Sequence, residues 1–161
     1  NRPFFKPVSL DPKLARAMVN LACPDGGRLL DPFCGTGGVI VEGILCGIDC
    51  CGSDLAWPMV TGTRKNAVWA QERGGKGNFE IRNGSAVELS EIWEGPFDGF
   101  VFDPPYGRNA WKSADGFELL EGALSSCSSV ASDQANLVTL IPWPPSAFSE
   151  PIDEGQSFGK S

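Results

Sequence analysis

The chain has 161 residues, 42% of them hydrophobic, and a formal net charge of −7. This length fits one domain with its own core and is short for two ordinary domains. No run of about 18 apolar residues is present and the N-terminus lacks a signal-peptide pattern, so we expect a cytoplasmic protein with no membrane contact.

The residue types exclude several kinds of chemistry. The chain has no histidine, which removes the commonest general base and every Ser-His or Cys-His nucleophilic pair. Of the six cysteines only Cys46, Cys50 and Cys51 cluster, without Cys-x-x-Cys spacing. Zinc is the weaker alternative here, and we expect reduced, buried cysteines and no metal. The negative charge argues against a chain that grips nucleic acid by itself, because phosphate contacts supply much of such affinity.

The pattern along the chain predicts alternating helices and strands. Asp11 as N-cap and Pro12 at the first helical position begin a helix that runs to about Cys23. Strands are expected at 28–31, 49–54, 79–82, 97–103 and 135–141, the last with a buried character, and further helices at 39–46, 58–73 and 117–130. This alternation predicts an α/β fold with a mostly parallel sheet, helices on both faces, and ligands beyond the carboxyl ends of the strands.

A glycine-containing loop follows the first expected strand. It reads Asp31-Pro32-Phe33-Cys34-Gly35-Thr36-Gly37-Gly38, an acid at a strand end before glycines that let the backbone turn and a ligand approach. Ile40 stands where a dinucleotide fingerprint has its third glycine, and the Gly-Lys-Ser/Thr of a phosphate loop is absent. Asp54 ends the next strand, where a carboxylate can accept hydrogen bonds from both ribose hydroxyls. These features predict a nucleoside cofactor. The alternative is that Asp31 only caps a helix and that Asp54 is only an acid in a surface turn.

S-adenosylmethionine fits this pattern because it carries an ammonium, a carboxylate and a sulfonium but no phosphate. Asp31 would face the ammonium, and backbone N–H groups near Gly35, Gly37 and Gly38 would meet the carboxylate. Further cofactor-binding candidates are Leu55, Ser85 and Ala86. Ser85 stands where enzymes that bind S-adenosylmethionine often have an acid that contacts adenine N6. The alternative is that Ser85 only forms part of a turn.

The segment Asp103-Pro104-Pro105-Tyr106 is the most specific candidate for a reaction site. Its prolines fix the backbone at a strand end and withhold two N–H donors, which leaves carbonyl oxygens free as acceptors. An exocyclic amine of a nucleobase is a poor nucleophile, so a site must bind both hydrogens and aim the nitrogen. Asp103 Oδ and the Pro104 carbonyl could do this, and Tyr106 could stack on an unpaired or flipped-out base. A rigid turn over a core is the alternative.

In these motifs the chain resembles the THUMP-associated tRNA guanine-N2 methyltransferases, and among them the archaeal enzymes that act at position ten of tRNA. The likeness lies in residues 2–7, 11–17, 31–38, 52–54 and 103–108. It implies a Rossmann-like S-adenosylmethionine-dependent methyltransferase fold and methylation of guanine N2 in tRNA. It also implies that Phe5 and Pro7 lie over the cofactor; a hydrophobic staple on the first helix is the alternative for Phe5.

The resemblance also sets expectations for domain organisation. We assign residues 1–145 to the methyltransferase catalytic domain, with 1–27 as its N-terminal segment and first helix. Residues 146–161 are rich in proline, glycine and serine, and we expect them to form an irregular or disordered tail. The resemblance implies that tRNA is docked by a separate THUMP-like or partner domain outside this chain. We do not find in the sequence the antiparallel hairpin that ordinarily closes the family's sheet. Two rival functions stay open. One is amino methylation of adenine at N6 or of cytosine in DNA or RNA, or of a glutamine amide, and the other is a non-catalytic binding module.

Overall fold

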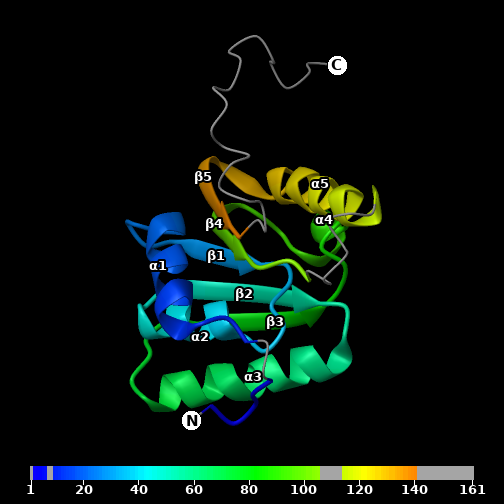
Figure 1. The fold of residues 1–161 in the computed structure, drawn as a ribbon. Coiled ribbons are helices and arrows are strands. Elements are labelled where there is room, and N and C mark those ends of the chain that lie inside the picture. Colours follow the sequence, from blue (N-terminus) through cyan, green and yellow to red (C-terminus); the bar gives the residue numbers. More distant parts are fainter. Residues whose placement is uncertain (1, 7–8, 106–113, 141–161) are drawn as a thin grey trace, which may run out of the picture.

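The computed structural model describes residues 2–6, 9–105 and 114–140 (Figure 1). In chain order the elements are α1 (Pro12–Ala22), β1 (Arg28–Asp31), α2 (Gly38–Leu45), β2 (Asp49–Asp54), α3 (Trp57–Glu72), β3 (Phe79–Asn83), α4 (Leu89–Ile92), β4 (Phe97–Phe102), α5 (Ala114–Ser128) and β5 (Ala131–Thr139). The five strands form one sheet in the order β3-β2-β1-β4-β5, and all four neighbouring pairs are parallel. The expected α/β architecture is therefore confirmed.

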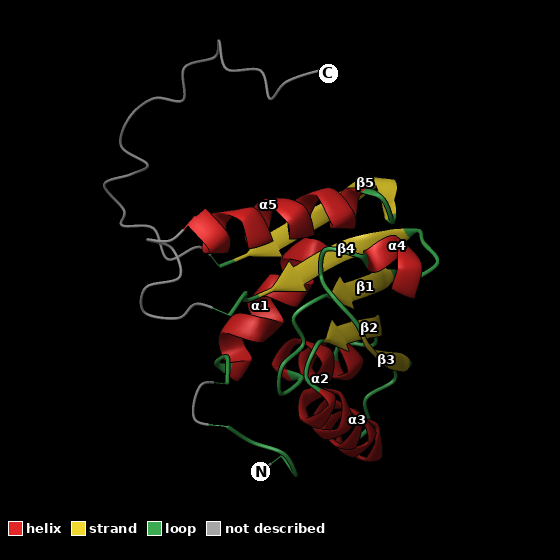
Figure 2. Ribbon diagram, turned by 90° about the vertical axis from the view of Figure 1, so that its right-hand side faces the viewer, coloured by secondary structure: helices red, strands yellow, loops and turns green. Residues whose placement is uncertain are grey.

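Helices cover both faces of this sheet. The helices α1, α2 and α3 pack on one face, where Val19, Ile40 and Val60 are fully buried, and α4 and α5 pack on the other. Neighbouring residues of β1 serve the two cores, Leu29 one and Leu30 the other, because successive side chains of a strand point to opposite faces. The arrowheads of β1, β2 and β4 point the same way (Figure 2), so their carboxyl ends meet along one edge.

Two expectations about the elements were wrong. The four-residue helix α4 was not expected, since it is too short to show a helical period. The strand β5 begins at Ala131, not at Ala135, and none of its nine residues is buried. Among the described residues β5 pairs only with β4 and forms an edge of the sheet, which explains its exposure. The other boundaries differ by three residues or fewer.

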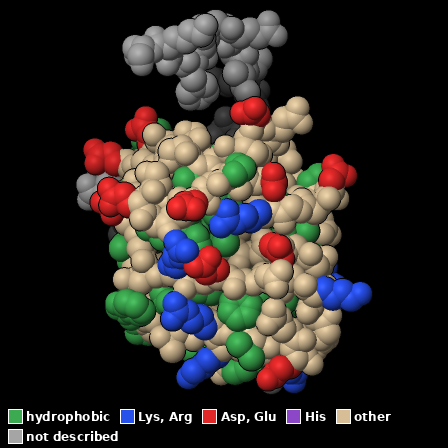
Figure 3. Space-filling model, turned by 180° about the vertical axis from the view of Figure 1, so that it is seen from behind, with side chains coloured by type: hydrophobic (Ala, Val, Ile, Leu, Met, Phe, Trp, Pro, Cys, Tyr) green, Lys and Arg blue, Asp and Glu red, His purple; other side chains and the backbone are tan. Residues whose placement is uncertain are grey.

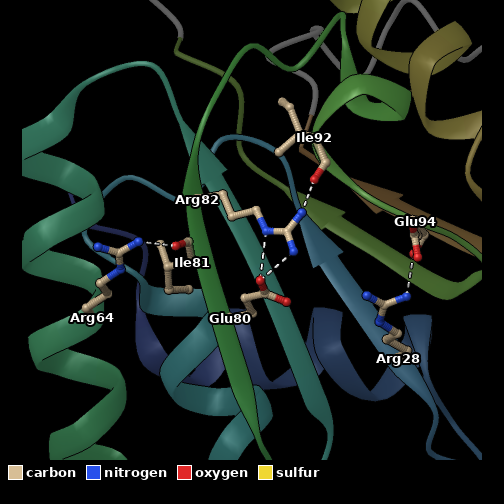
Figure 4. A network of polar contacts seen from close by, with 7 residues as sticks. All are labelled: Arg28, Arg64, Glu80, Ile81, Arg82, Ile92 and Glu94. Atoms are coloured by element: carbon tan, nitrogen blue, oxygen red, sulfur yellow. Dashed lines mark hydrogen bonds and ion pairs between the residues drawn. The ribbon is translucent and has the colours of Figure 1, made fainter.

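Two arginines hold the connection that leads into β4 (Figure 4). The Arg28 guanidinium lies 4.2 Å from the ring centre of Phe97 and donates to the Glu94 carbonyl over 2.6 Å. Arg82 lies 4.5 Å from the ring centre of Trp93 and donates to the carbonyl of Ile92. These bonds tie the start of β4 to β1 and β3, and so help to fix where its carboxyl end lies.

The structure also bears on the expectations about nucleic-acid binding, cysteines, metals and membranes. On the face shown in Figure 3, acidic and basic side chains are interspersed and form no single basic field. All six cysteines are free and five are buried as expected, whereas Cys46 is exposed because it follows the last turn of α2. Within the described ranges no three cysteine, aspartate or glutamate side chains are grouped so that they could hold a metal ion. None of the helices described there has the length and apolarity to cross a membrane.

Candidate active site

The loop between β1 and α2 adopts a conformation that two of its glycines make possible. Gly35 and Gly37 have φ of +50° and +76°, in the left-handed region that side chains rarely adopt. A Cβ atom on Gly37 would also lie 2.7 Å from Thr63 Cγ2. Thr63 Oγ1 donates to the Gly35 carbonyl over 2.8 Å. This hydrogen bond fixes the loop to α3.

The N–H groups of this loop are used differently from the sequence-based prediction. Gly35 N–H donates to Asp54 Oδ2 over 3.0 Å, and Gly37 N–H donates to the Cys34 carbonyl over 2.6 Å. Both donors are thus used within the protein, one by the end of β2 and one by the loop itself. The first N–H that α2 pairs internally is that of Val41, so the helix provides no acceptor for the N–H groups of Gly38 and Val39.

A pocket of about 420 Å³ opens at the carboxyl edge of the sheet, within the size range of ligand sites. Twelve residues predicted from sequence line it: Asp31, Phe33, Cys34, Gly35, Thr36, Gly38, Asp54, Leu55, Ser85, Ala86, Asp103 and Pro105. The pocket therefore brings together the glycine loop, the end of β2, the turn after β3 and the end of β4.

The other predicted residues lie elsewhere. Pro32, Gly37 and Pro104 are neighbours of lining residues in the chain but do not line the pocket themselves. Phe5 is 65% exposed and lines an adjacent groove with Arg2 and Trp69. Pro7 and Tyr106 fall outside the described residues, so their predicted roles stay predictions.

Six lining residues were not among the catalytic or cofactor-binding candidates from the sequence: Lys6, Ser9, Leu10, Val39, Met59 and Leu119. Val39 and Met59 each lie in the first turn of a helix that follows a strand, where the topology rule for ligand sites could have found them. Leu119 comes from α5, far along the chain, and no local signal marks it.

Asp31 is a buried acid that lines the pocket. Asp31 is 3% exposed, and its Oδ1 accepts the Phe33 N–H over 3.0 Å. Burial raises the pKa of this carboxyl to about 8; the Phe33 N–H opposes the rise, and the charges of Asp54 and Asp103 add to it. In the part of the chain that the structure describes, no lysine or arginine forms an ion pair with it.

Asp54 is held in place by backbone donors at both oxygens. Besides the Gly35 N–H on Oδ2, its Oδ1 accepts the Ala56 N–H over 2.9 Å. Each carboxylate oxygen keeps a second acceptor position, and Asp54 lines the pocket. Asn83 at the end of β3 donates to the carbonyls of Asp54 and Leu55 over 2.8 and 2.9 Å, which fixes the end of β2.

Asp103 completes a row of three carboxyl groups at the ends of β1, β2 and β4. It follows β4, is half-buried and lines the pocket with Pro105. Burial raises the pKa of the Asp103 carboxyl above its usual value. Pro104 is buried and has no N–H to donate. One pocket thus joins the cofactor and reaction motifs inferred from the sequence.

Comparison with known proteins places this arrangement in a family. The family model UPF0020, described as the RMKL-like methyltransferase domain, matches residues 1–146. The chain belongs to this family.

Curated relatives of this methyltransferase domain include two archaeal proteins named tRNA (guanine(10)-N2)-dimethyltransferase. The protein of Methanothermobacter thermautotrophicus is 44% identical over 120 residues, which cover 74% of this chain and 34% of the relative. That of Pyrococcus abyssi is 38% identical over 130 residues, which cover 80% and 38%. The chain therefore spans little more than a third of the length of these relatives.

Solved structures show the same fold. TrmN from Thermus thermophilus superposes with a TM-score of 0.65 at 24% identity, over 81% of this chain and 39% of that one. The glycopeptide N-methyltransferase MtfA, solved as a complex with S-adenosylmethionine, superposes with a TM-score of 0.64 at 15% identity, over 93% and 64%. The expected Rossmann-like methyltransferase fold is confirmed.

Proposed function

We propose that this chain is the catalytic domain of an S-adenosylmethionine-dependent methyltransferase that acts on the exocyclic N2 amine of guanine in tRNA. The observation that carries the proposal is that one pocket joins Asp31 and Asp54 to Asp103 and Pro105. The chain's membership of a methyltransferase domain family supports the reaction class. The names of the archaeal relatives support guanine and tRNA.

The chemistry of the pocket fits this cofactor. The Asp31 carboxyl, buried and without an ion pair among the described residues, suits an ammonium group, which would replace the lost solvation of the carboxylate. The fixed Asp54 carboxylate suits two hydroxyl donors. The N–H groups of Gly38 and Val39 at the start of α2 suit a carboxylate. When bound, S-adenosylmethionine supplies a methyl group activated by the sulfonium.

The residues after β4 would orient the amine. Asp103 Oδ and the Pro104 carbonyl would each accept one amine hydrogen, which points the nitrogen lone pair toward the methyl group. Catalysis then comes mainly from alignment of donor and acceptor for in-line transfer, with no covalent enzyme intermediate. Tyr106 would stack on the flipped-out base.

Docking of the tRNA is assigned to a separate THUMP-like or partner domain outside this chain. The net charge of −7 supports this division of labour, because a domain that binds RNA alone usually carries a basic surface. In this proposal residues 1–145 are the catalytic domain and the protein works in the cytoplasm.

The deciding experiment is methylation of unmodified tRNA by the full-length protein with labelled S-adenosylmethionine, followed by mass spectrometry of the nucleosides. We expect N2-methylated guanosine. Methylated adenosine or cytidine would replace guanine as the target. If calorimetry detects no binding of S-adenosylmethionine, the chain is a binding module and the enzyme assignment is wrong.

A further inference from the structure

The N-terminal segment, here the described residues 2–6 with Ser9 and Leu10, forms one wall of the pocket through Lys6, Ser9 and Leu10. It precedes α1 and has no regular secondary structure. A wall of this kind keeps its place only if other parts of the fold hold its backbone. Two groups of contacts do so, and both meet the glycine loop.

The first contact is made by Asn66, a fully buried residue of α3. Its Oδ1 accepts the Phe4 N–H over 2.9 Å, and its Nδ2 donates to the Phe4 carbonyl over 2.7 Å. The same Nδ2 donates to the Thr36 carbonyl over 2.8 Å. Both N–H donors of the amide are thus used, and one side chain joins the N-terminal segment to the glycine loop.

The second contact also ends on Thr36. Ser9 Oγ and Thr36 Oγ1 lie 2.9 Å apart in a hydrogen bond, and Ser9 Oγ lies 2.7 Å from the Lys6 carbonyl, to which it donates. Since a hydroxyl donates one hydrogen, Thr36 is then the donor to Ser9. The segment is therefore fastened on both sides of Lys6, and both fastenings converge on one residue of the loop.

Gly62 makes room for this attachment on the same helix. A Cβ atom at this position would overlap the ring of Phe4. The absence of a side chain at Gly62, one turn before Asn66, lets the Phe4 ring lie against α3. Glycine inside a helix lowers its stability by about 1 kcal/mol relative to alanine, and the close approach of Phe4 accounts for its presence.

We infer that Asn66 is a positioning residue that sets the affinity of the pocket for its ligand, by holding the N-terminal segment against the glycine loop. It lines no part of the pocket itself and acts through Phe4 and Thr36. The inference rests on the proposed function only for the identity of the ligand, S-adenosylmethionine.

The test compares Asn66→Ala and Gly62→Ala with a control, Leu21→Ala, which shortens an exposed apolar side chain near the end of α1 that does not line the pocket. Gly62→Ala leaves Asn66 and the glycine loop unchanged and improves the intrinsic propensity of α3, so it displaces Phe4 without removing a core contact. Backbone hydrogen exchange is measured without ligand, and binding of S-adenosylmethionine is measured by calorimetry.

We expect faster exchange confined to the N-terminal segment in both variants and a dissociation constant about tenfold higher, as for the loss of one or two buried hydrogen bonds. The control should match the wild type. In methylation assays the KM for S-adenosylmethionine should rise with kcat at saturation within about twofold. The double variant should be little worse than either single one, because both act through the same segment.

Two results would overturn the inference: wild-type exchange in the segment of both variants, or unchanged affinity in Gly62→Ala despite a released segment. Failure of the wild type to bind S-adenosylmethionine would instead refute the proposed function. The exchange data would then still decide whether Asn66 anchors the segment.

Discussion

Replacement of Asp31 by asparagine should make the protein more stable, and increasingly so as pH rises. Burial raises the pKa of this carboxyl from 3.8 to about 8 in the fold. Between these two values the folded chain holds a proton that the unfolded chain has released. A state that binds more protons is disfavoured as pH rises, so this group lowers the stability of the wild type across that window.

The magnitude follows from the linkage relation. Through the middle of the window the wild type should lose about 1.4 kcal/mol of unfolding free energy per pH unit relative to Asp31→Asn. From pH 5 to pH 7 the difference between the two proteins therefore grows by on the order of 3 kcal/mol. The amide oxygen can still accept the Phe33 N–H that Oδ1 accepts in the wild type.

The assay is urea denaturation of the wild type, Asp31→Asn and the control Asp25→Asn, whose side chain is exposed, at several pH values from 5 to 9. The control should follow the wild type. A constant difference between Asp31→Asn and wild type across this range would show that Asp31 is ionised in the empty pocket. The assigned environment of Asp31 would then be wrong.

Three further predictions concern the pocket and its loop. If the ammonium of S-adenosylmethionine pairs with Asp31, binding at pH 7 should release about 0.9 proton, since a group of pKa about 8 is about nine-tenths protonated there. Calorimetry in buffers of different ionisation enthalpy measures this release. Zero release in the wild type would refute the pairing. Gly37→Ala should cost about 1–3 kcal/mol more in denaturation than Gly26→Ala, because both glycines have positive φ but only at position 37 would Cβ meet Thr63; equal costs would contradict this. Asp103→Ala should reduce methylation at least about 100-fold while calorimetric cofactor binding stays within about threefold, and near-normal methylation would remove Asp103 from the reaction site.

Local sequence was enough to predict the parts of the site that depend on the backbone of their own segment. The turn at Gly35 and Gly37 needs positive φ, which glycine provides and which leaves a pattern in the sequence. Asp31, Asp54 and Asp103 could be assigned to one edge because strands that alternate with helices run parallel, so their carboxyl ends meet. The sheet and the row of acids followed from chain order.

Contacts between distant segments could not be predicted in this way. The Gly35 N–H is used by Asp54, and the Asn66 amide is used by Phe4 and Thr36. These bonds depend on how α3 and β2 pack. No local pattern encodes the bond between Phe4 and Asn66, which are 62 residues apart. The exposure of β5 depends on its place at the sheet edge among the described residues, although its composition suggested burial. The sequence by itself thus determined where the backbone can turn and that the strands run parallel. Tertiary packing decided which donors stay free for a ligand and how the N-terminal segment forms one wall of the pocket, because both depend on groups brought together only in the folded chain.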